Sequence, residues 1–226
     1  MIPGWPRYDL YVITDVVQSR GRSALEIARA ALEGGADAVQ LRDKSSPAIN
    51  LCRSAVEIQP LARKFGALFV VNDRADVALL SRSDGLHLGQ EDLPAREARR
   101  LLPRPVVLGI SAGTRDEARR AEKEGADYLG VGPIFATGTK PDAGPALGLE
   151  ALGAIVRSVS IPVVAIGGID RDNIAAVIAT GAAGAAVVTA VVSAEDMAAA
   201  TRALKRIIVE SRRVPSPAEH RGSLFK

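Results

Sequence analysis

The sequence predicts a single (β/α)₈ barrel, the TIM-barrel architecture, formed by residues 1–210. Three observations support it: short apolar runs recur along the chain, a helix-like segment follows each run, and the runs are continuous rather than alternating. Continuous apolar runs are expected of parallel strands that are covered on both faces. Eight strand–helix units in about 210 residues fit this barrel, which usually needs about 250 residues and is sometimes built from about 200.

The eight predicted strands are spread over the whole predicted barrel. They are Asp9–Thr14, Ala38–Arg42, Leu68–Asn72, Gly85–Gly89, Val106–Ser111, Tyr128–Gly132, Pro162–Gly167 and Ala185–Thr189. The clearest of the predicted helices are Ser23–Glu33, Thr114–Glu124 and Ala194–Glu210. Aromatic residues make up only 4% of the chain, so Ala, Val, Leu and Ile must form the core. This composition fits small-residue helices packed on buried parallel strands.

A weak internal echo supports the repeat. EGGADAVQLR (33–42) resembles EGADYLGVG (124–132), and TGAAGAAVV (180–188) varies the same pattern. In each segment we expect a helix to end at a glycine in a left-handed cap before the next strand begins. The competing fold is a doubly wound open sheet, but the first strand ends at Thr14-Asp15 and no GxGxxG motif follows it.

Composition argues against several other classes of protein. Lys and Arg number 29 against 26 acidic residues, a formal charge of +3 that gives no support for nucleic-acid binding. The first residues show no signal-peptide pattern, and no window reaches the roughly 18 apolar residues of a membrane span, so we predict a cytoplasmic protein. Cys52 is predicted to be a buried structural thiol in a helix. The polar segment 211–226 is predicted to be a disordered tail.

Polar residues follow the predicted strands at the end where this fold carries its chemistry. From strand two to strand eight, the residues singled out at these ends are Gln40, Arg42 and Lys44; Asn72 and Asp73; Gln90 and Asp92; Ser111; Thr137 to Lys140; Gly167 and Gly168; and Val188 and Thr189. We expect them to converge on one mouth. The alternative for the charged members is that they are solvated loop charges.

The segment Gly130–Lys140, GVGPIFATGTK, is the most informative of these strand ends. Small residues let the backbone approach a ligand, while hydroxyls, amides and a cation are the groups that hold phosphate oxygens. The alternative is an ordinary surface loop. The other polar strand ends favour phosphate binding.

Asp73 and Asp92 are predicted to bind one Mg²⁺ ion, because this metal prefers one or two carboxylates together with substrate phosphates. The alternative is a pair of salt bridges to Arg74 and Arg96. His87 is predicted to be a packed core histidine.

The predicted charges suit two phosphorylated ligands. Arg42, Lys44 and Lys140, together with Mg²⁺ and the two carboxylates, roughly balance a diphosphate ester. A second, smaller phosphate would lie against Gly168 and Thr189.

The chain resembles the thiamine-phosphate synthase family over about residues 8–208. The motifs that carry the resemblance are QLRDK (40–44), NDR (72–74), HLGQED (87–92), GPIFATGTK (132–140) and GGI (167–169). Each motif is weakly specific alone, but here all five occur in the order found in the family. The resemblance implies a transferase that joins hydroxymethylpyrimidine diphosphate to thiazole phosphate, giving thiamine phosphate and pyrophosphate.

The resemblance also implies a role for each matching residue. The pyrimidine diphosphate would be bound by Gln40, Leu41, Arg42, Asp43, Lys44, Asn72, Ser111 and Lys140. The thiazole phosphate would be bound by Thr137, Gly138, Thr139, Gly168, Val188 and Thr189. The predicted catalytic residues are Arg42, Lys44, Ser111 and Lys140, and the predicted metal ligands are Asp73 and Asp92. The family often has serine where this chain has Thr189, which keeps the hydroxyl.

Two other functions stay open at this point. The first is a thiazole tautomerase-like isomerase of the same barrel family, which needs a proton-transfer group, commonly histidine. Strand five instead ends in GISAG (109–113), with Ser111, and both predicted metal ligands are present. The second is a non-catalytic barrel that binds a phosphorylated metabolite. Neither alternative releases pyrophosphate, whereas the synthase does. No oligomeric state is predicted.

Overall fold

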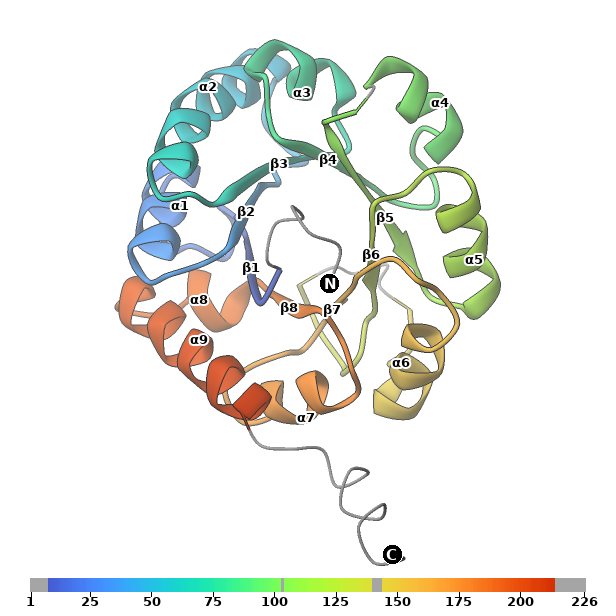
Figure 1. The fold of residues 1–226 in the computed structure, drawn as a ribbon. Coiled ribbons are helices and arrows are strands. Elements are labelled where there is room, and N and C mark those ends of the chain that lie inside the picture. The colour runs from blue at the N-terminus through green and yellow to red at the C-terminus, as the bar shows by residue number, and fades with distance from the viewer. Residues whose placement is uncertain (1–7, 103, 140–143, 214–226) are drawn as a thin grey trace, which may run out of the picture.

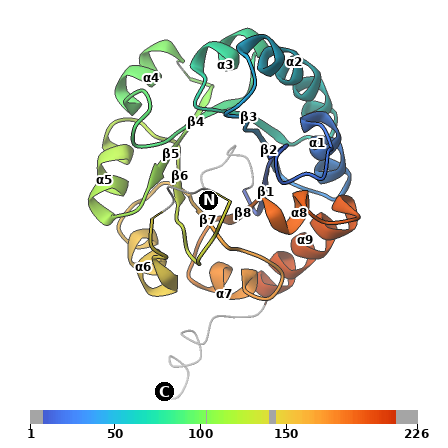
Figure 2. The same ribbon diagram turned by 180° about the vertical axis from the view of Figure 1, so that it is seen from behind.

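The computed structural model of the chain describes residues 8–102, 104–139 and 144–213. Their eight strands form one closed barrel in the order β1 to β8, and each strand is parallel to both neighbours. Helices surround the strands in an outer ring, seen from one end in Figure 1 and from the other in Figure 2. The prediction of a (β/α)₈ barrel is confirmed.

Each strand lies within two residues of its predicted bounds. The strands are β1 (Leu10–Ile13), β2 (Ala38–Leu41), β3 (Leu68–Asn72), β4 (Gly85–Leu88), β5 (Val107–Ala112), β6 (Tyr128–Val131), β7 (Val163–Ile166) and β8 (Gly184–Val187). The prediction for the last strand was wrong at its end, because Thr189 begins a short helix instead of extending β8.

The helices fill the connections between strands. They are α1 (Ala24–Glu33), α2 (Ala48–Lys64), α3 (Ala75–Ser81), α4 (Ala95–Leu101), α5 (Arg115–Lys123), α6 (Gly148–Val156), α7 (Ile174–Ala179), α8 (Thr189–Val192) and α9 (Met197–Arg213). Two begin with a capping box, in which Ser23 with Glu26, and Thr114 with Glu117, satisfy free backbone N–H groups. The predicted left-handed glycines are also confirmed, with φ of 91° at Gly35.

Helix α9 passes the boundary that the sequence predicts for the barrel. Residues 211–213 belong to the helix, so the predicted tail begins three residues too early. The reason is a pair of tertiary contacts: Arg212 Nη2 donates to the carbonyl oxygen of Ala183 at 2.6 Å and pairs with Asp9 Oδ1 at 2.9 Å. Residues 214–226 lie outside the described residues, and their disorder stays a prediction.

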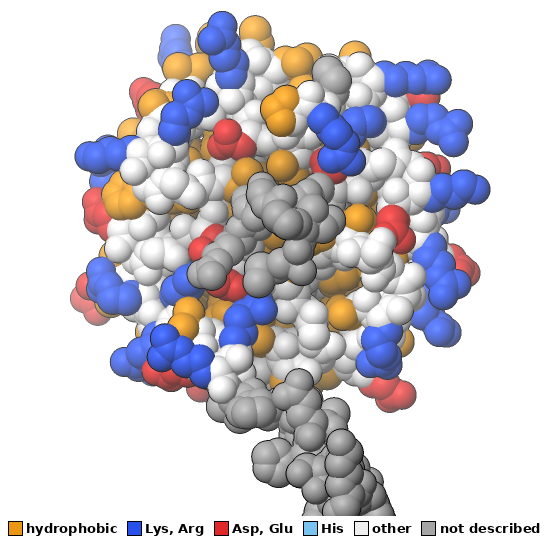
Figure 3. All heavy atoms as spheres, in the orientation of Figure 1, with side chains coloured by type: hydrophobic (Ala, Val, Ile, Leu, Met, Phe, Trp, Pro, Cys, Tyr) orange, Lys and Arg blue, Asp and Glu red, His pale blue; other side chains and the backbone are white. Residues whose placement is uncertain are grey.

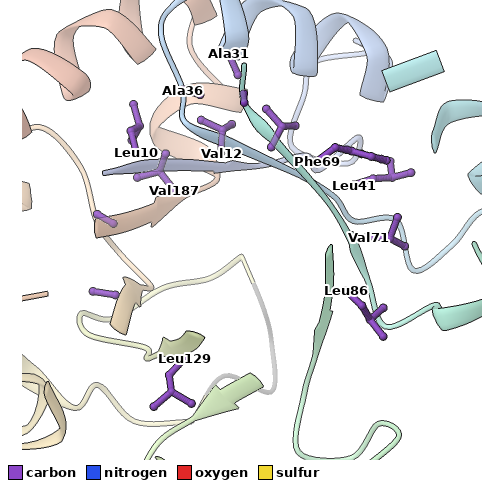
Figure 4. Packing of buried hydrophobic residues seen from close by; sticks show 14 of the residues in the cluster. Leu10, Val12, Ala31, Ala36, Leu41, Phe69, Val71, Leu86, Leu129 and Val187 are labelled. Carbon is purple, nitrogen blue, oxygen red and sulfur yellow. The ribbon is translucent and has the colours of Figure 1, made fainter. Parts of the chain in front are cut away.

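The core has two parts because inward and outward residues alternate along each strand. Leu10 and Val12 point outward and join the large cluster between strands and helices, part of which is shown in Figure 4. Tyr11 and Ile13 belong to a second cluster, which fills the barrel interior together with residues such as Tyr128. This inner cluster forms the floor beneath the mouth of the barrel. Cys52 is half-buried in α2 and packs against the outer cluster, so it is less enclosed than predicted.

Side chains of both charges are spread around the face shown in Figure 3, in keeping with the small net charge of +3. Within the described residues, none of the helices has the length and apolar character needed to cross a bilayer.

Replacing Lys205 with methionine should destabilise the fold. The ammonium of Lys205 lies 3.1 Å from Asp9 Oδ2 and 2.7 Å from Asp37 Oδ1, and its side chain is only 21% exposed. Without it, the largely buried carboxylate of Asp37 loses its ion-pair partner, and Asp9 keeps only its pairing with Arg212. We expect a loss of about 2–3 kcal/mol in the free energy of unfolding, somewhat less than for a fully buried pair, measured by urea denaturation.

Arg206→Met is the matched control, because this neighbour pairs with Glu210 at 3.9 Å on an exposed surface. It should change stability by less than about 0.5 kcal/mol. Equal stability of the two variants would show that the Lys205 contacts do not hold α9 on the barrel.

Candidate active site

Two adjoining cavities open at the carboxyl ends of the strands. The larger chamber has a volume of about 420 Å³ and the smaller chamber about 190 Å³. The residues that line both are Ile13, Arg42, Ser111, Gly130, Gly132, Ile166 and Ala186. The two chambers therefore form one continuous mouth, and Arg42 and Ser111 lie where they meet.

The larger chamber brings together residues from the ends of β2 to β5. The predicted site residues that line it are Gln40, Arg42, Lys44, Asn72, Asp73, Asp92 and Ser111. Apart from Asp43, and from Lys140, which lies outside the described residues, these are the polar side chains predicted to bind the diphosphate and the metal. The predicted convergence of the strand ends is thus observed, while the role of each residue stays a prediction.

The smaller chamber brings together residues that follow β6, β7 and β8. The predicted site residues that line it are Thr137, Thr139, Gly168, Val188 and Thr189. Within this set, Thr139 N donates to Thr137 Oγ1 at 3.3 Å, and Gly168 has a positive φ of 62°. Apart from Gly138, these residues are the set predicted for the second phosphate.

Three predicted residues do not line either chamber with their side chains. Leu41 points outward, is 1% exposed and packs in the outer core near Phe69 (Figure 4). Asp43 Oδ1 instead accepts hydrogen bonds from the backbone N–H of Ser45 and from that of Ser46, both at 2.9 Å. Gly138 has no side chain to contribute. Any role for these three must therefore rest on their backbone groups.

Asp73 and Asp92 lie together on the wall of the larger chamber. Burial, followed by the neighbouring Asp92 carboxylate, raises the pKa of Asp73. Lys44 Nζ lies 3.6 Å from Asp73 Oδ2, and the N–H of Gly89 donates to Asp92 Oδ2 at 2.6 Å. Asp73 also has φ of 60°, a strained conformation for a residue with a side chain. The alternative of a salt bridge to Arg74 is not observed, since Arg74 pairs with Asp76.

The charges of the larger chamber favour a bound cation. Its charged lining residues, among those described, are Arg42, Lys44, Asp73, Glu91 and Asp92. Acidic groups outnumber basic ones, which opposes a diphosphate unless a cation joins the site. Two neighbouring carboxylates on one wall suit Mg²⁺, which takes its other ligands from phosphate and water. The described residues hold no cluster of three or more acidic, histidine or cysteine ligands.

Arg42 is held in place by residues that follow β1. Its Nη1 donates to Asp15 Oδ2 at 3.2 Å, and its backbone N–H donates to Thr14 Oγ1 at 3.0 Å. Asp15 is 7% exposed, so this pairing orients the guanidinium across the junction of the chambers. The sequence places Asp15 at a strand end, but its partnership with Arg42 depends on the β1–β2 register and was missed.

His87 was predicted to be a core residue, but it lines the larger chamber. Its Nδ1 lies 2.9 Å from the hydroxyl of Tyr128 and its Nε2 lies 3.0 Å from Ser111 Oγ. Burial lowers the pKa of His87 to about 4, against the opposing effect of nearby Asp92, so the ring is neutral at physiological pH. Tyr11 and Tyr128, on the floor of the same chamber, were also missed.

Comparison with known proteins agrees with this geometry. The sequence profile described as thiamine monophosphate synthase matches residues 10–191. The chain belongs to the thiamine monophosphate synthase family. The thiamine-phosphate synthase of Moorella thermoacetica is 55% identical over 207 residues, covering 92% of this chain and 99% of that relative. That of Methanocella arvoryzae is 54% identical, covering 91% and 97% of the two chains.

A solved structure supports both the fold and the family. The thiamine phosphate pyrophosphorylase of Pyrococcus furiosus superposes with a TM-score of 0.84 at 46% identity, covering 90% of this chain and 96% of that one. The predicted resemblance is thus confirmed, and the chain is a transferase of thiamine biosynthesis that acts on small molecules. The isomerase and the non-catalytic binding protein are not favoured.

Proposed function

We propose that the chain condenses hydroxymethylpyrimidine diphosphate, bound in the larger chamber, with thiazole phosphate, bound in the smaller one. The observation that supports this is the division of the mouth into two chambers that share Arg42 and Ser111. The larger chamber has the charged groups that a diphosphate and its metal need. The smaller one has hydroxyls and glycines, which suit a monophosphate. Two phosphorylated molecules would then meet at the shared wall.

The chemistry needs few protein groups. The thiazole nitrogen attacks the methylene carbon of the pyrimidine, a carbon–nitrogen bond forms, and the carbon–oxygen bond to the diphosphate breaks to release pyrophosphate. The attacking nitrogen has a lone pair and no proton to lose, so no general base is required. Arg42 and Lys44 stabilise the negative charge that develops on the leaving group. Confinement in adjoining chambers holds the two reacting atoms close together.

One Mg²⁺ ion and a cytoplasmic location are parts of this proposal. Asp73 and Asp92 would hold the ion on the wall of the larger chamber, where their paired carboxylates lie. When bound, the ion would neutralise charge on the diphosphate. Lys140, outside the described residues, stays a predicted third cationic side chain beside Arg42 and Lys44.

Gly168→Ala should weaken binding of thiazole phosphate. Gly168 has φ of 62°, and an added Cβ would lie 2.7 Å from the carbonyl oxygen of Ala136 and 2.8 Å from Phe135 Cβ. The loop after β6 must then shift, and with it Thr137 and Thr139. We expect the KM for thiazole phosphate to rise about tenfold or more, while the KM for pyrimidine diphosphate changes little; a loss of about 1.4 kcal/mol corresponds to this change.

Gly66→Ala is the matched control. Gly66 has a similar φ of 66°, but an added Cβ would meet nothing within 4 Å, and the residue lies between α2 and β3 at the opposite end of the barrel. It reproduces the backbone strain without moving the loop, so both KM values should stay normal. Equal loss of affinity for both substrates in Gly168→Ala would contradict the assignment of one substrate to each chamber.

Product formation tests the proposed function itself. The protein is incubated with MgCl₂ and both substrates, and thiamine phosphate is measured by mass spectrometry. We expect product only when both substrates are present. Conversion of a thiazole phosphate alone would support an isomerase, and binding without any conversion would support a sensor.

A further inference from the structure

Five side chains from five strands form one continuous hydrogen-bonded chain across the floor of the larger chamber. Gln40 Nε2 lies 2.9 Å from the Tyr11 hydroxyl, which lies 2.9 Å from the Tyr128 hydroxyl. The chain continues to His87 Nδ1 at 2.9 Å and from His87 Nε2 to Ser111 Oγ at 3.0 Å. Both ends, Gln40 and Ser111, line the larger chamber.

The chain has a direction because each middle member has one hydrogen to donate. Gln40 Nε2 only donates, so the Tyr11 oxygen accepts from it and the Tyr11 hydrogen goes to Tyr128. Tyr128 then donates to His87 Nδ1, and a neutral imidazole that accepts at Nδ1 carries its hydrogen on Nε2. His87 therefore donates to Ser111 Oγ. The hydrogen of Ser111 is left free to point into the chamber.

The opposite direction of the hydrogen bonds would give Ser111 a different role. The Gln40 amide would have to turn its oxygen toward Tyr11, His87 would carry its hydrogen on Nδ1, and Ser111 would donate to His87. Ser111 would then offer the chamber only an acceptor oxygen. Phosphate oxygens are themselves acceptors, so this serine could not bind them.

We propose that this chain sets Ser111 as a hydrogen-bond donor toward the diphosphate, with Tyr11, Tyr128 and His87 acting as positioning residues. The identity of the diphosphate rests on the proposed function, whereas the direction of the hydrogen-bonded chain does not. Burial makes the hydrogen bonds change direction together: Tyr11 is 2% exposed and Tyr128 is 1% exposed, and in such surroundings reversing one hydrogen bond alone would leave a hydrogen without an acceptor.

The tautomer of His87 tests the direction without any activity measurement. The full protein contains two histidines, so ¹⁵N-histidine labelling gives two pairs of imidazole nitrogen signals, and a His220→Gln variant assigns them. We expect His87 to be neutral with its hydrogen on Nε2. A hydrogen on Nδ1, or on both nitrogens near pH 7, would overturn the proposal. This measurement uses the protein with His87, Tyr11 and Tyr128 intact. It decides the direction of the hydrogen-bonded chain even if substitutions in the barrel floor impair folding.

A pair of tyrosine variants tests the consequence for catalysis. Tyr128→Phe removes the hydroxyl that connects Tyr11 to His87, while the ring keeps its packing. Tyr8→Phe is the matched control, because the Tyr8 ring stacks on Tyr128 with centroids 5.0 Å apart and its buried hydroxyl has no hydrogen-bond partner among the described residues. Both variants remove one buried hydroxyl from the same cluster.

We expect Tyr128→Phe to lower kcat about tenfold, the effect of losing one orienting hydrogen bond, with an unchanged KM for thiazole phosphate. In this variant, His87 should no longer be found only as the tautomer with its hydrogen on Nε2. Tyr8→Phe should leave both kcat and the His87 signal unchanged. Equal kinetics in the two variants would overturn the proposal. If the unmodified protein makes no thiamine phosphate, the proposed function fails. The tautomer measurement still decides the direction of the hydrogen-bonded chain.

Discussion

Replacing Arg42 with alanine should lower turnover by about 10²- to 10³-fold, the usual effect of removing one charged contact to a developing anion. Arg42 lines both chambers and is oriented by Asp15 at 3.2 Å, so its guanidinium lies at their junction, where the proposed mechanism brings the leaving group and the second substrate together. Steady-state pyrophosphate release with both substrates saturating measures the effect, and circular dichroism checks the fold.

Two further variants sharpen this prediction. Arg42→Lys keeps the charge but loses the planar guanidinium group that Asp15 orients. Its turnover should therefore lie between that of Arg42→Ala and that of the unmodified protein. Arg63→Ala, at an exposed position in the last turn of α2, should behave like the unmodified chain. Normal turnover in a folded Arg42→Ala variant would show that the junction of the chambers does not carry the reaction.

Asp92→Asn should abolish most turnover, by about 10²-fold or more, and should remove the stabilisation of the fold by MgCl₂. Asp92 shares the wall of the larger chamber with Asp73, and an amide at position 92 offers the ion a neutral ligand in place of a charged one. Thermal unfolding with MgCl₂ and with a chelator measures binding without relying on activity. Asp76→Asn is the control, because this carboxylate is 58% exposed and pairs with Arg74.

The effect of Mg²⁺ on stability should depend on pH. Burial and the Asp92 carboxylate raise the pKa of Asp73 in the folded protein. The contribution of Asp73 to the stability of the metal-free fold is therefore present at low pH and lost as the pH rises through the raised value. The rise in Tm caused by MgCl₂ should grow over the same range, as the ionised pair becomes able to bind the ion. A rise in Tm that is the same from pH 4 to pH 8 would contradict the paired-carboxylate site.

Much of the fold was predictable because parallel strands covered on both faces leave continuous apolar runs, and capping glycines such as Gly35 separate them from the helices. The residues at strand ends could be predicted for the same reason. Once the strands are placed, QLRDK and NDR must lie at the mouth. What the sequence could not show was which residues of an apolar strand point inward.

The missed residues share this cause. Tyr11 and Tyr128 lie within strands whose neighbours are also apolar, so no alternation marks them as floor residues of the chamber. His87 was misread as core for the same reason, because its polar contacts come from β5 and β6 rather than from its own segment. The end of α9 was misplaced because Asp9 and Ala183, which hold Arg212, lie far away in sequence.

The most direct test of the two-chamber mechanism is the stoichiometry of pyrophosphate release. The protein is mixed with MgCl₂ and hydroxymethylpyrimidine diphosphate, with or without thiazole phosphate, and pyrophosphate and thiamine phosphate are measured in the same samples over time. We predict one pyrophosphate for each thiamine phosphate, and sustained release only when thiazole phosphate is present. Sustained release of pyrophosphate without thiazole phosphate would show that water, rather than a substrate in the smaller chamber, is the acceptor, and would contradict the mechanism.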